Sequence, residues 1–293
     1  MTSDTEREIA SQPGAWRRAA ALAPSASGLP EAGERVAVAG CGTSWFMAQA
    51  YAALREASGL GETDAFTASE LPAARPYDRV LAISRSGTTT EVLRALERRR
   101  DAEGPATVLT AVAGSPVTTA AGHAVVLGFA DETSVVQTRF ATSALALLRA
   151  HLGEDLSPAI ADAEAALAMP LPNDPAAFEH FVFLGAGWTI GIANEAALKL
   201  REAALAHTES YPAMEYRHGP IALAGPGSLV WILGSPDASV AGDIAATGAT
   251  VRVAELDPMA ELVLIQRFAV ALAGVRGFDP DHPRHLARSV VLT

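Results

Sequence analysis

Two stretches of sequence, VAVAGCGTSWFMAQA (residues 36–50) and VFLGAGWTIGIANEAALK (residues 182–199), share one plan. Each starts as a short apolar run, passes through a glycine-rich turn and ends in an amphipathic segment. That order is typical of a buried parallel strand followed by a helix. RVLAISRSGTTTEVLRAL (79–96) and SLVWILGSPDASVAGDIA (228–245) repeat the plan, starting 43 and 46 residues after their predecessors. The two matched pairs predict an α/β fold whose second half duplicates the first.

The remaining sequence extends this alternation. We predict further strands at 107–112, 124–127 and 250–254, and helices at 44–58, 88–101, 139–152, 189–206 and 260–274. Proline and aspartate interrupt helical periodicity in MPLPNDP (169–175). We therefore expect one lobe with a lead-in helix at residues 1–170 and a second lobe at residues 171–293.

Composition excludes several classes of protein. The formal charge of −11, with no basic stripe, argues against a nucleic-acid partner. A single cysteine, Cys41, excludes an internal disulfide and a cysteine-rich metal site. The apolar run after Arg17 and Arg18 ends at Pro24, and no later segment reaches 18 uninterrupted apolar residues. We expect a soluble cytoplasmic protein with no membrane partner.

The segment EAALKLRE (195–202) contains Lys199, the only lysine among 293 residues. On a helix, Glu195, Lys199 and Glu202 fall at i, i+4 and i+7 and share one face. His218 follows in a His-Gly-Pro turn. A carboxylate, a neighbouring cation and an imidazole are the parts of a proton-transfer site. Taken by themselves, these residues also fit a solvated helix with an internal ion pair.

The segment SRSGTTT (84–90) leaves a predicted buried strand and opens a helix with five hydroxyl side chains. Free N–H groups and the helix dipole favour an anion at such a place, and Gly87 allows the backbone to bend closely around it. A phosphate monoester site is therefore predicted. The alternative is an ordinary N-cap completed by Glu91. A Walker A loop is excluded because the segment has no Gly-Lys pair.

Three other segments are less specific. GCGTS (40–44) repeats the strand–turn arrangement, and in a doubly wound sheet it would lie at the same edge as residues 84–89. GAGWTIG (185–191) is spaced G-x-G-x-x-x-G, which is weak support for a dinucleotide site. ETSVVQT (132–138) either lines a pocket or caps the helix that follows, and its spacing does not separate the two.

Together these motifs resemble the SIS (sugar isomerase) family. The sequence is most similar to the isomerase half of glucosamine-6-phosphate synthase and to free-standing SIS isomerases and deaminases. The pieces that carry the resemblance are CGTS (41–44), SRSGTT (84–89), ETSVVQT (132–138), EAALKLRE (195–202), RHGPIAL (217–223) and PRHLARSV (283–290).

The resemblance implies two flavodoxin-like, doubly wound lobes, a C-terminal tail over the active site and a homodimer with a shared active site. It implies a sugar-phosphate substrate and no cofactor or metal. Glu202 matches the base that moves a proton between C1 and C2, and His218 matches the ring-opening histidine of the partner subunit. Glu195 and Lys199 match residues that orient the base. The implied phosphate ligands are Ser44, Ser84, Ser86 and Thr89, with Arg85 as an added cation, and the implied sugar contacts are Thr43, Val135 and Arg288.

One departure from the synthase pattern bears on the reaction. The tail lysine that forms an imine in the synthase is Arg288 here, and arginine stays protonated. We therefore expect an aldose–ketose isomerase or deaminase acting on an aminosugar 6-phosphate such as glucosamine 6-phosphate. The alternatives are a lyase that eliminates the C3 hydroxyl of N-acetylglucosamine 6-phosphate, and a non-catalytic sugar-phosphate sensor.

Overall fold

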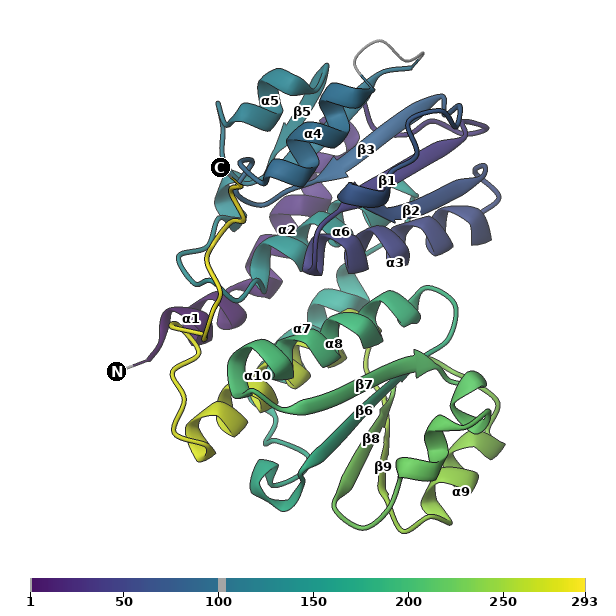
Figure 1. The fold of residues 1–293 in the computed structure, drawn as a ribbon, viewed down its shortest axis with the longest axis vertical. Helices are drawn as coiled ribbons and strands as arrows, with labels where there is room; N and C mark the ends of the chain where they lie inside the picture. Colours follow the sequence, from purple (N-terminus) through teal and green to yellow (C-terminus); the bar gives the residue numbers. More distant parts are fainter. Residues whose placement is uncertain (1, 100–103, 293) are drawn as a thin grey trace. The chain divides into compact units, whose positions relative to one another are not determined.

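A computed structural model describes residues 2–99 and 104–292, which form two compact units (Figure 1). Unit 1 comprises Met1–Pro13, Ser134–Thr138 and Ser157–Leu286, and unit 2 comprises Gly14–Thr133, Arg139–Leu156 and Ala287–Thr293. Each unit contains one parallel sheet with helices on it. The predicted α/β class is confirmed.

Unit 2 has a five-stranded sheet in the order β2-β1-β3-β4-β5, with every neighbouring pair parallel. Its strands are β1 (Val36–Gly40), β2 (Thr63–Thr67), β3 (Arg79–Ile83), β4 (Ala106–Thr110) and β5 (His123–Val126). This order is that of flavodoxin-like sheets, whose ligands bind beyond the carboxyl ends of the strands. The turns after β1 and β3 therefore lie at the edge where a ligand is expected.

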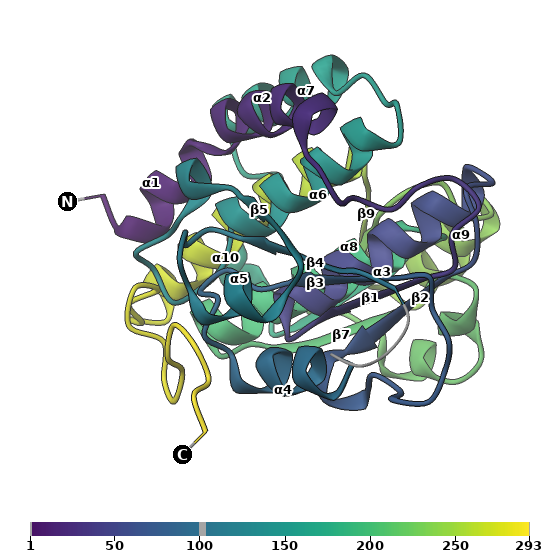
Figure 2. The ribbon, with the colours of Figure 1, turned by 90° about the horizontal axis from the view of Figure 1, so that it is seen from above.

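Helices cover both faces of the unit 2 sheet. They are α3 (Thr43–Ala57), α4 (Thr90–Arg98), α5 (Pro116–Ala120) and α6 (Arg139–His151). Helix α2 (Gln12–Leu22) lies on α6, where the Trp16 indole N–H donates to Thr142 Oγ1 at 2.9 Å. Helix α3 packs on β1 and β2 and against α6, while α4 and α5 share a core cluster with alternate residues of β1 and β3. Figure 2 shows α4 on the side of the strands away from α6. Both faces of the central strands are therefore buried, as their continuous apolar runs predict.

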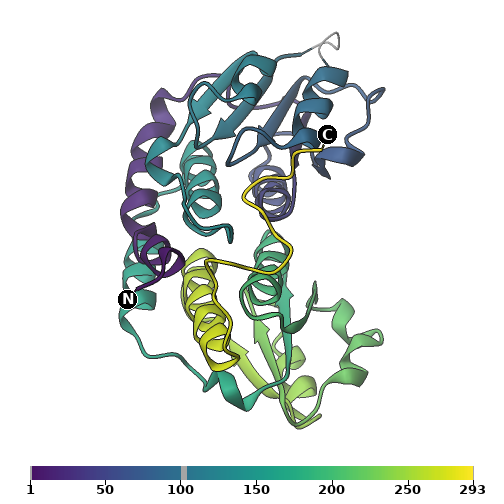
Figure 3. The same ribbon diagram turned by 60° about the vertical axis from the view of Figure 1, so that its left-hand side comes forward.

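Unit 1 has a four-stranded parallel sheet in the order β7-β6-β8-β9, which matches the first four strands of the other sheet. Its strands are β6 (His180–Gly185), β7 (His207–Pro212), β8 (Ser228–Ile232) and β9 (Thr250–Val253). Its helices are α1 (Asp4–Ala10), α7 (Ser157–Ala168), α8 (Thr189–Ala204), α9 (Ser239–Ala245) and α10 (Pro258–Val275). Figure 3 shows α8 (green) and α10 (yellow) side by side on one face of the sheet. The matched strand order fits two flavodoxin-like lobes, and their duplication stays a prediction.

Helix α10 is long and largely apolar. Within the described residues it is the one helix long and apolar enough to cross a membrane. In that window 67% of the residues are buried, and the helix packs against α7 and α8. Burial of this kind is typical of the core helix of an α/β unit.

The structure divides the chain at other points than residue 170. Helix α7 belongs to unit 1, where the Arg267 guanidinium of α10 donates to the carbonyl oxygens of Ala166 (2.6 Å) and Met169 (2.8 Å). Residues 287–293 belong to unit 2 rather than to the unit of the second sheet. The difference arises because these segments pack on elements that are distant in sequence.

Most predicted strands and helices are present within one or two residues of their expected bounds. Strands β2 and β7 were not predicted, because both are edge strands with half-exposed polar side chains. Helices α2, α5 and α7 were not predicted either. The helix predicted at 88–101 is α4, which ends at Arg98, and the final predicted residues lie outside the described range.

Candidate active site

Helix α8 in unit 1 carries the three residues expected to share a helix face. The Lys199 Nζ atom lies 2.5 Å from Glu202 Oε2 and 3.3 Å from Glu195 Oε1. The Lys199 and Glu195 side chains are each 1% exposed, whereas the Glu202 side chain is 19% exposed. The structure thus brings the three together, with Glu202 as the member that solvent reaches.

The burial of Lys199 affects its charge in two opposing ways. Loss of solvent favours the neutral amine, but the carboxylates of Glu195 and Glu202 outweigh it and raise the pKa of Lys199 above its usual range. Lys199 is therefore a permanent cation at neutral pH. Its ion pair holds the Glu202 carboxylate in place, and the role of Glu202 as a base stays a prediction.

His218, also in unit 1, directly follows the short helix η5 (Glu215–Arg217) and is exposed. Gly219 adopts a φ of 131°, which favours glycine and shapes the turn. Met214 and Leu223 are 47% and 66% exposed on either side of the histidine in sequence. The segment therefore exposes an imidazole and two large apolar side chains.

In unit 2, residues 84–89 between β3 and α4 form what we call the hydroxyl loop. Gly87 has a φ of 66°, and a Cβ atom at this position would lie 2.0 Å from Ser115 Oγ. The loop therefore fits closely against the start of α5 only with glycine at this position. Ser84 and Ser86 are buried, and Thr89 is half-buried as the residue before α4.

The hydroxyl loop has polar groups that its neighbours leave unused. The Thr88 N–H donates to Ser86 Oγ at 3.2 Å. Across residues 2–99 and 104–292, nothing accepts a hydrogen bond from the N–H groups of Ser86, Gly87 and Thr89, and the buried Ser84 hydroxyl has no partner. Free backbone N–H groups in a turn that opens a helix favour an anion. The loop therefore offers unused donors, and phosphate binding by it stays a prediction.

The turn after β1 reaches the same edge of the unit 2 sheet, because β1 and β3 are parallel neighbours. Thr43 and Ser44 open α3 and are both 3% exposed. A Cβ atom on Gly40 would lie 2.6 Å from the Ser44 carbonyl carbon, so glycine lets the helix start directly on the strand end. The turn thus adds two hydroxyl residues to the edge that holds the hydroxyl loop.

Arg85, which belongs to the hydroxyl loop, forms a buried ion pair with Glu132. The Arg85 Nη1 atom lies 3.4 Å from Glu132 Oε2, and Arg85 Nη2 donates to the Arg288 carbonyl oxygen at 2.9 Å. Glu132 Oε1 accepts from the Arg139 N–H at 2.6 Å, so Glu132 caps α6. Of the two roles left open for residues 132–138, the cap is observed. Phosphate binding by Arg85 stays a prediction.

Two of the residues that were predicted to contact the sugar lie among protein interactions that were not predicted. The Arg288 side chain, 39% exposed, is paired with Asp131. Val135 is half-buried and belongs to the segment Ser134–Thr138 of unit 1, where the Ser134 hydroxyl donates to Glu8. Asp131 and Glu8 were not anticipated, since their partners are far away in sequence.

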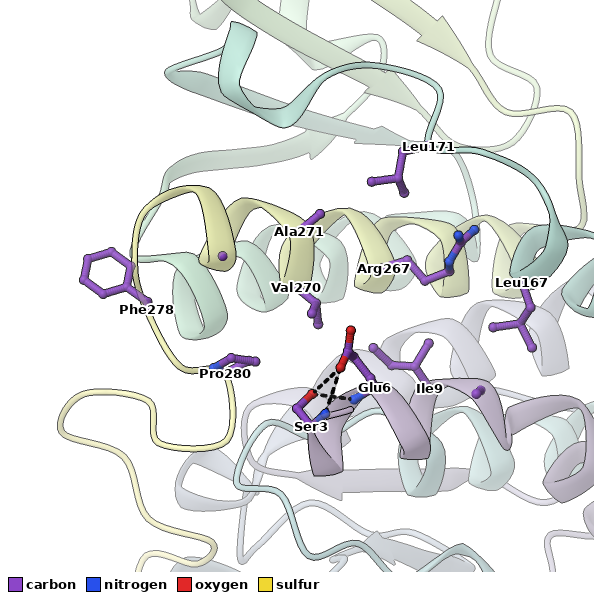
Figure 4. Close-up of a pocket in the computed structure, with 12 residues that line it drawn as sticks. Ser3, Glu6, Ile9, Leu167, Leu171, Arg267, Val270, Ala271, Phe278 and Pro280 are labelled. Atoms are coloured by element: carbon purple, nitrogen blue, oxygen red, sulfur yellow. Dashed lines mark hydrogen bonds between the residues drawn. The ribbon is translucent and has the colours of Figure 1, made fainter. Parts of the chain in front are cut away.

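A cavity of about 630 Å³ opens in unit 1 between α1, α10 and the segment after α7 (Figure 4). Its lining is mostly apolar, with Glu6 and Arg267 as charged members; the Glu6 carboxylate accepts from the Ser3 N–H. None of the predicted site residues lines it. Glu195, Lys199 and Glu202 of α8 therefore lie in a different part of the unit.

Comparison with known proteins connects these features. Residues 29–152 match the family model of the SIS domain. Glutamine–fructose-6-phosphate aminotransferase (isomerizing) from Aeropyrum pernix is 31% identical over 91% of this chain and 52% of its own length. The chain thus spans about half the length of the curated relatives that it matches.

Two solved structures resemble the whole chain. Glucosamine-6-phosphate deaminase from Thermotoga maritima has a TM-score of 0.86 and 25% identity, covering 99% of this chain and 100% of that one. The C-terminal domain of glucosamine-fructose-6-phosphate aminotransferase from Francisella tularensis has a TM-score of 0.82 and 21% identity, with coverage of 97% and 99%; at that identity the likeness is one of fold. The predicted resemblance is confirmed: the chain carries a SIS domain and is a SIS-family protein.

Proposed function

We propose that the protein is an aldose–ketose isomerase or deaminase acting on an aminosugar 6-phosphate of the glucosamine 6-phosphate type. The observation that carries the proposal is the buried Lys199, which holds the more exposed carboxylate of Glu202. A full-length likeness to a glucosamine-6-phosphate deaminase supports the same reaction class. No imine lysine is needed, and Lys199 is committed to two carboxylates.

In the proposed mechanism the hydroxyl loop binds the 6-phosphate and so fixes one end of the substrate. His218 exchanges the protons that open the ring at C1. Glu202 takes the C2 proton of the open aldose and returns a proton to C1, and the electron pair of the C2–H bond moves through an enediol-type intermediate. With a 2-amino substrate the product is a 2-imine, and water hydrolyses it to the ketose and ammonia. Glu195 and Lys199 orient Glu202 throughout.

We further propose that the His218 turn serves the active site of a second copy, as the family resemblance implies. Support comes from the exposure of His218 between Met214 and Leu223, since exposed apolar side chains beside a catalytic group favour an interface. The same strand order in the two sheets supports the predicted duplication.

NMR spectroscopy in deuterated water tests the reaction. Glucosamine 6-phosphate should yield a ketose phosphate with solvent deuterium incorporated, accompanied by ammonia in the deaminase case. With N-acetylglucosamine 6-phosphate, loss of the C2 proton together with a new vinylic signal would instead identify an elimination. Absence of exchange with both compounds would contradict an enzyme of this substrate class.

A further inference from the structure

Arg85 connects three parts of unit 2 that are far apart in sequence. Its side chain is 1% exposed and contacts Glu132, 47 residues away, and the Arg288 carbonyl, 203 residues away. The Glu132 side chain is fully buried and is fixed to the start of α6 by the Arg139 N–H. An arginine fork that is paired with a fixed carboxylate has little freedom to turn. Arg85 therefore presents a rigid donor to the C-terminal segment.

The C-terminal segment lies along the hydroxyl loop and the first turn of α4. We call residues 288–292 the strap. Thr88 Oγ1 lies 2.8 Å from Ser289 Oγ, the Thr90 N–H donates to the Val290 carbonyl at 3.1 Å, and the Leu292 N–H donates to Thr90 Oγ1 at 2.9 Å. With the Arg85 bond, four hydrogen bonds join the strap to the loop and to α4.

We propose that Arg85 is a positioning residue that holds the strap on the hydroxyl loop and so couples strap docking to anion binding. The strap uses Thr88 and Thr90, whereas the N–H groups of Ser86, Gly87 and Thr89 stay open for the anion. A loop already held in one conformation costs a ligand less ordering entropy. Because such coupling is reciprocal, a bound anion also favours the docked strap.

The proposal deepens the proposed function by assigning a determinant of phosphate affinity, and it rests on the phosphate role of the loop. Its first test uses inorganic phosphate and needs no turnover. If the wild-type protein fails to convert glucosamine 6-phosphate, the proposed reaction fails while the phosphate test still decides the coupling.

Brief trypsin digestion followed by mass spectrometry measures strap docking. Cleavage after Arg288 requires the strap to leave the loop, and cleavage after the exposed Arg284 serves as an internal reference. Phosphate should slow cleavage at Arg288 relative to Arg284 in the wild-type protein. Arg85→Gln should speed that cleavage, and it should weaken phosphate binding by about tenfold, as expected for a lost charged hydrogen bond. Arg94→Gln, which changes an exposed arginine of α4, should behave as the wild type.

Two further variants separate positioning from direct phosphate contact and from misfolding. Arg85→Met with Glu132→Met removes the ion pair without leaving a buried charge alone, so the unit should stay folded. Leu292→Pro removes the strap N–H that bonds Thr90 and lies outside the loop. Both should weaken phosphate binding and expose Arg288. Unchanged phosphate affinity in these two variants would overturn the proposal, whatever Arg85→Gln shows.

Kinetics supply a further readout for the active enzyme. Loss of positioning should raise KM for the sugar phosphate more than it lowers kcat, because Arg85 does not touch the reacting carbons in the proposed mechanism. Arg85→Lys keeps the positive charge but loses the planar guanidinium, so its phosphate affinity should lie between those of Arg85→Gln and the wild type. A fall in kcat with unchanged KM in Arg85→Gln would contradict a positioning role through the strap.

Discussion

The turns after β3 and β8 occupy matching places in two sheets of the same strand order, yet their chemistry differs. The β3 turn is the hydroxyl loop, with unused N–H groups and no acidic residue before Glu91. The β8 turn contains Asp237, whose pKa is lowered by hydrogen bonds from the Ser239 hydroxyl and N–H. An ionised carboxylate repels a phosphate. Of these two turns, the β3 turn is therefore the one at which we predict an anion.

The helices that follow β1 and β6 show the reverse difference, because here the cluster of ionisable residues lies in unit 1. Helix α8, after β6, carries the buried Lys199 between two carboxylates. Helix α3, after β1, contains no acidic residue before Glu56. Two units with one architecture thus place their polar chemistry differently, at a turn in unit 2 and on a helix in unit 1. Substitutions in unit 2 should change binding, and substitutions on α8 should change turnover.

The largest expected effect is on turnover. Glu202→Gln should lower kcat by about 10²- to 10⁴-fold, the usual contribution of a general base, while phosphate binding in unit 2 is unchanged. Steady-state kinetics and isothermal titration calorimetry measure the two quantities. Glu97→Gln, an exposed change on α4, is the matched control. Full activity of Glu202→Gln would remove Glu202 as the base.

A change at Lys199 should affect the stability of unit 1. Lys199→Met leaves the carboxylates of Glu195 and Glu202 facing each other without a cation, which should cost about 3–5 kcal/mol in the free energy of unfolding. Chemical denaturation followed by circular dichroism measures the loss, and adding Glu195→Gln should recover part of it. If Lys199→Met were as stable as the wild type, the cluster would make no net contribution to the free energy of unfolding.

The Lys199 cluster also predicts a pH dependence with a definite sign. Its pKa in the folded protein is raised above the ordinary value of 10.5. The stabilisation is therefore complete below pH 10.5 and is lost as the pH rises through the folded-state pKa. Denaturation curves between neutral and strongly alkaline pH should show the wild type losing more stability than Lys199→Met.

Binding of the phosphate group should respond directly to the hydroxyl side chains of the hydroxyl loop. Ser86→Ala combined with Thr89→Ala should weaken binding of glucosamine 6-phosphate by about 10- to 100-fold, because each hydroxyl is expected to donate to a charged phosphate oxygen. Binding of unphosphorylated glucosamine should change little. Calorimetric titrations of both ligands would test this, and equal losses would argue against a phosphate site.

The smallest expected effect compares two glycines. Gly87 and Gly187 both have positive φ, 66° and 58°, but only at Gly87 would a Cβ atom meet a neighbour, at 2.0 Å. Gly187→Ala should cost about 1 kcal/mol in unfolding free energy through backbone strain alone. Gly87→Ala should cost more and should also weaken phosphate binding. Thermal melts with and without phosphate distinguish them, and identical losses would contradict the close fit.

The central strands and the α8 cluster could be predicted from sequence because their signals are local. Strand β3 is a continuous apolar run, and Glu195, Lys199 and Glu202 follow helical spacing. Strands β2 and β7 could not be predicted, since edge strands with half-exposed polar residues lack an apolar pattern. The partners of Arg85 were hidden by sequence separation, because an ion pair between distant residues leaves no periodic mark.

The buried position of the chain's sole lysine has a practical consequence for chemical labelling. An amine-reactive reagent added to the folded protein should modify the α-amino group but not Lys199, whose side chain is 1% exposed. A second added mass then reports that α8 has opened. The protein thus contains a built-in, single-site probe for the local unfolding of unit 1, read by intact-mass spectrometry without any engineered residue.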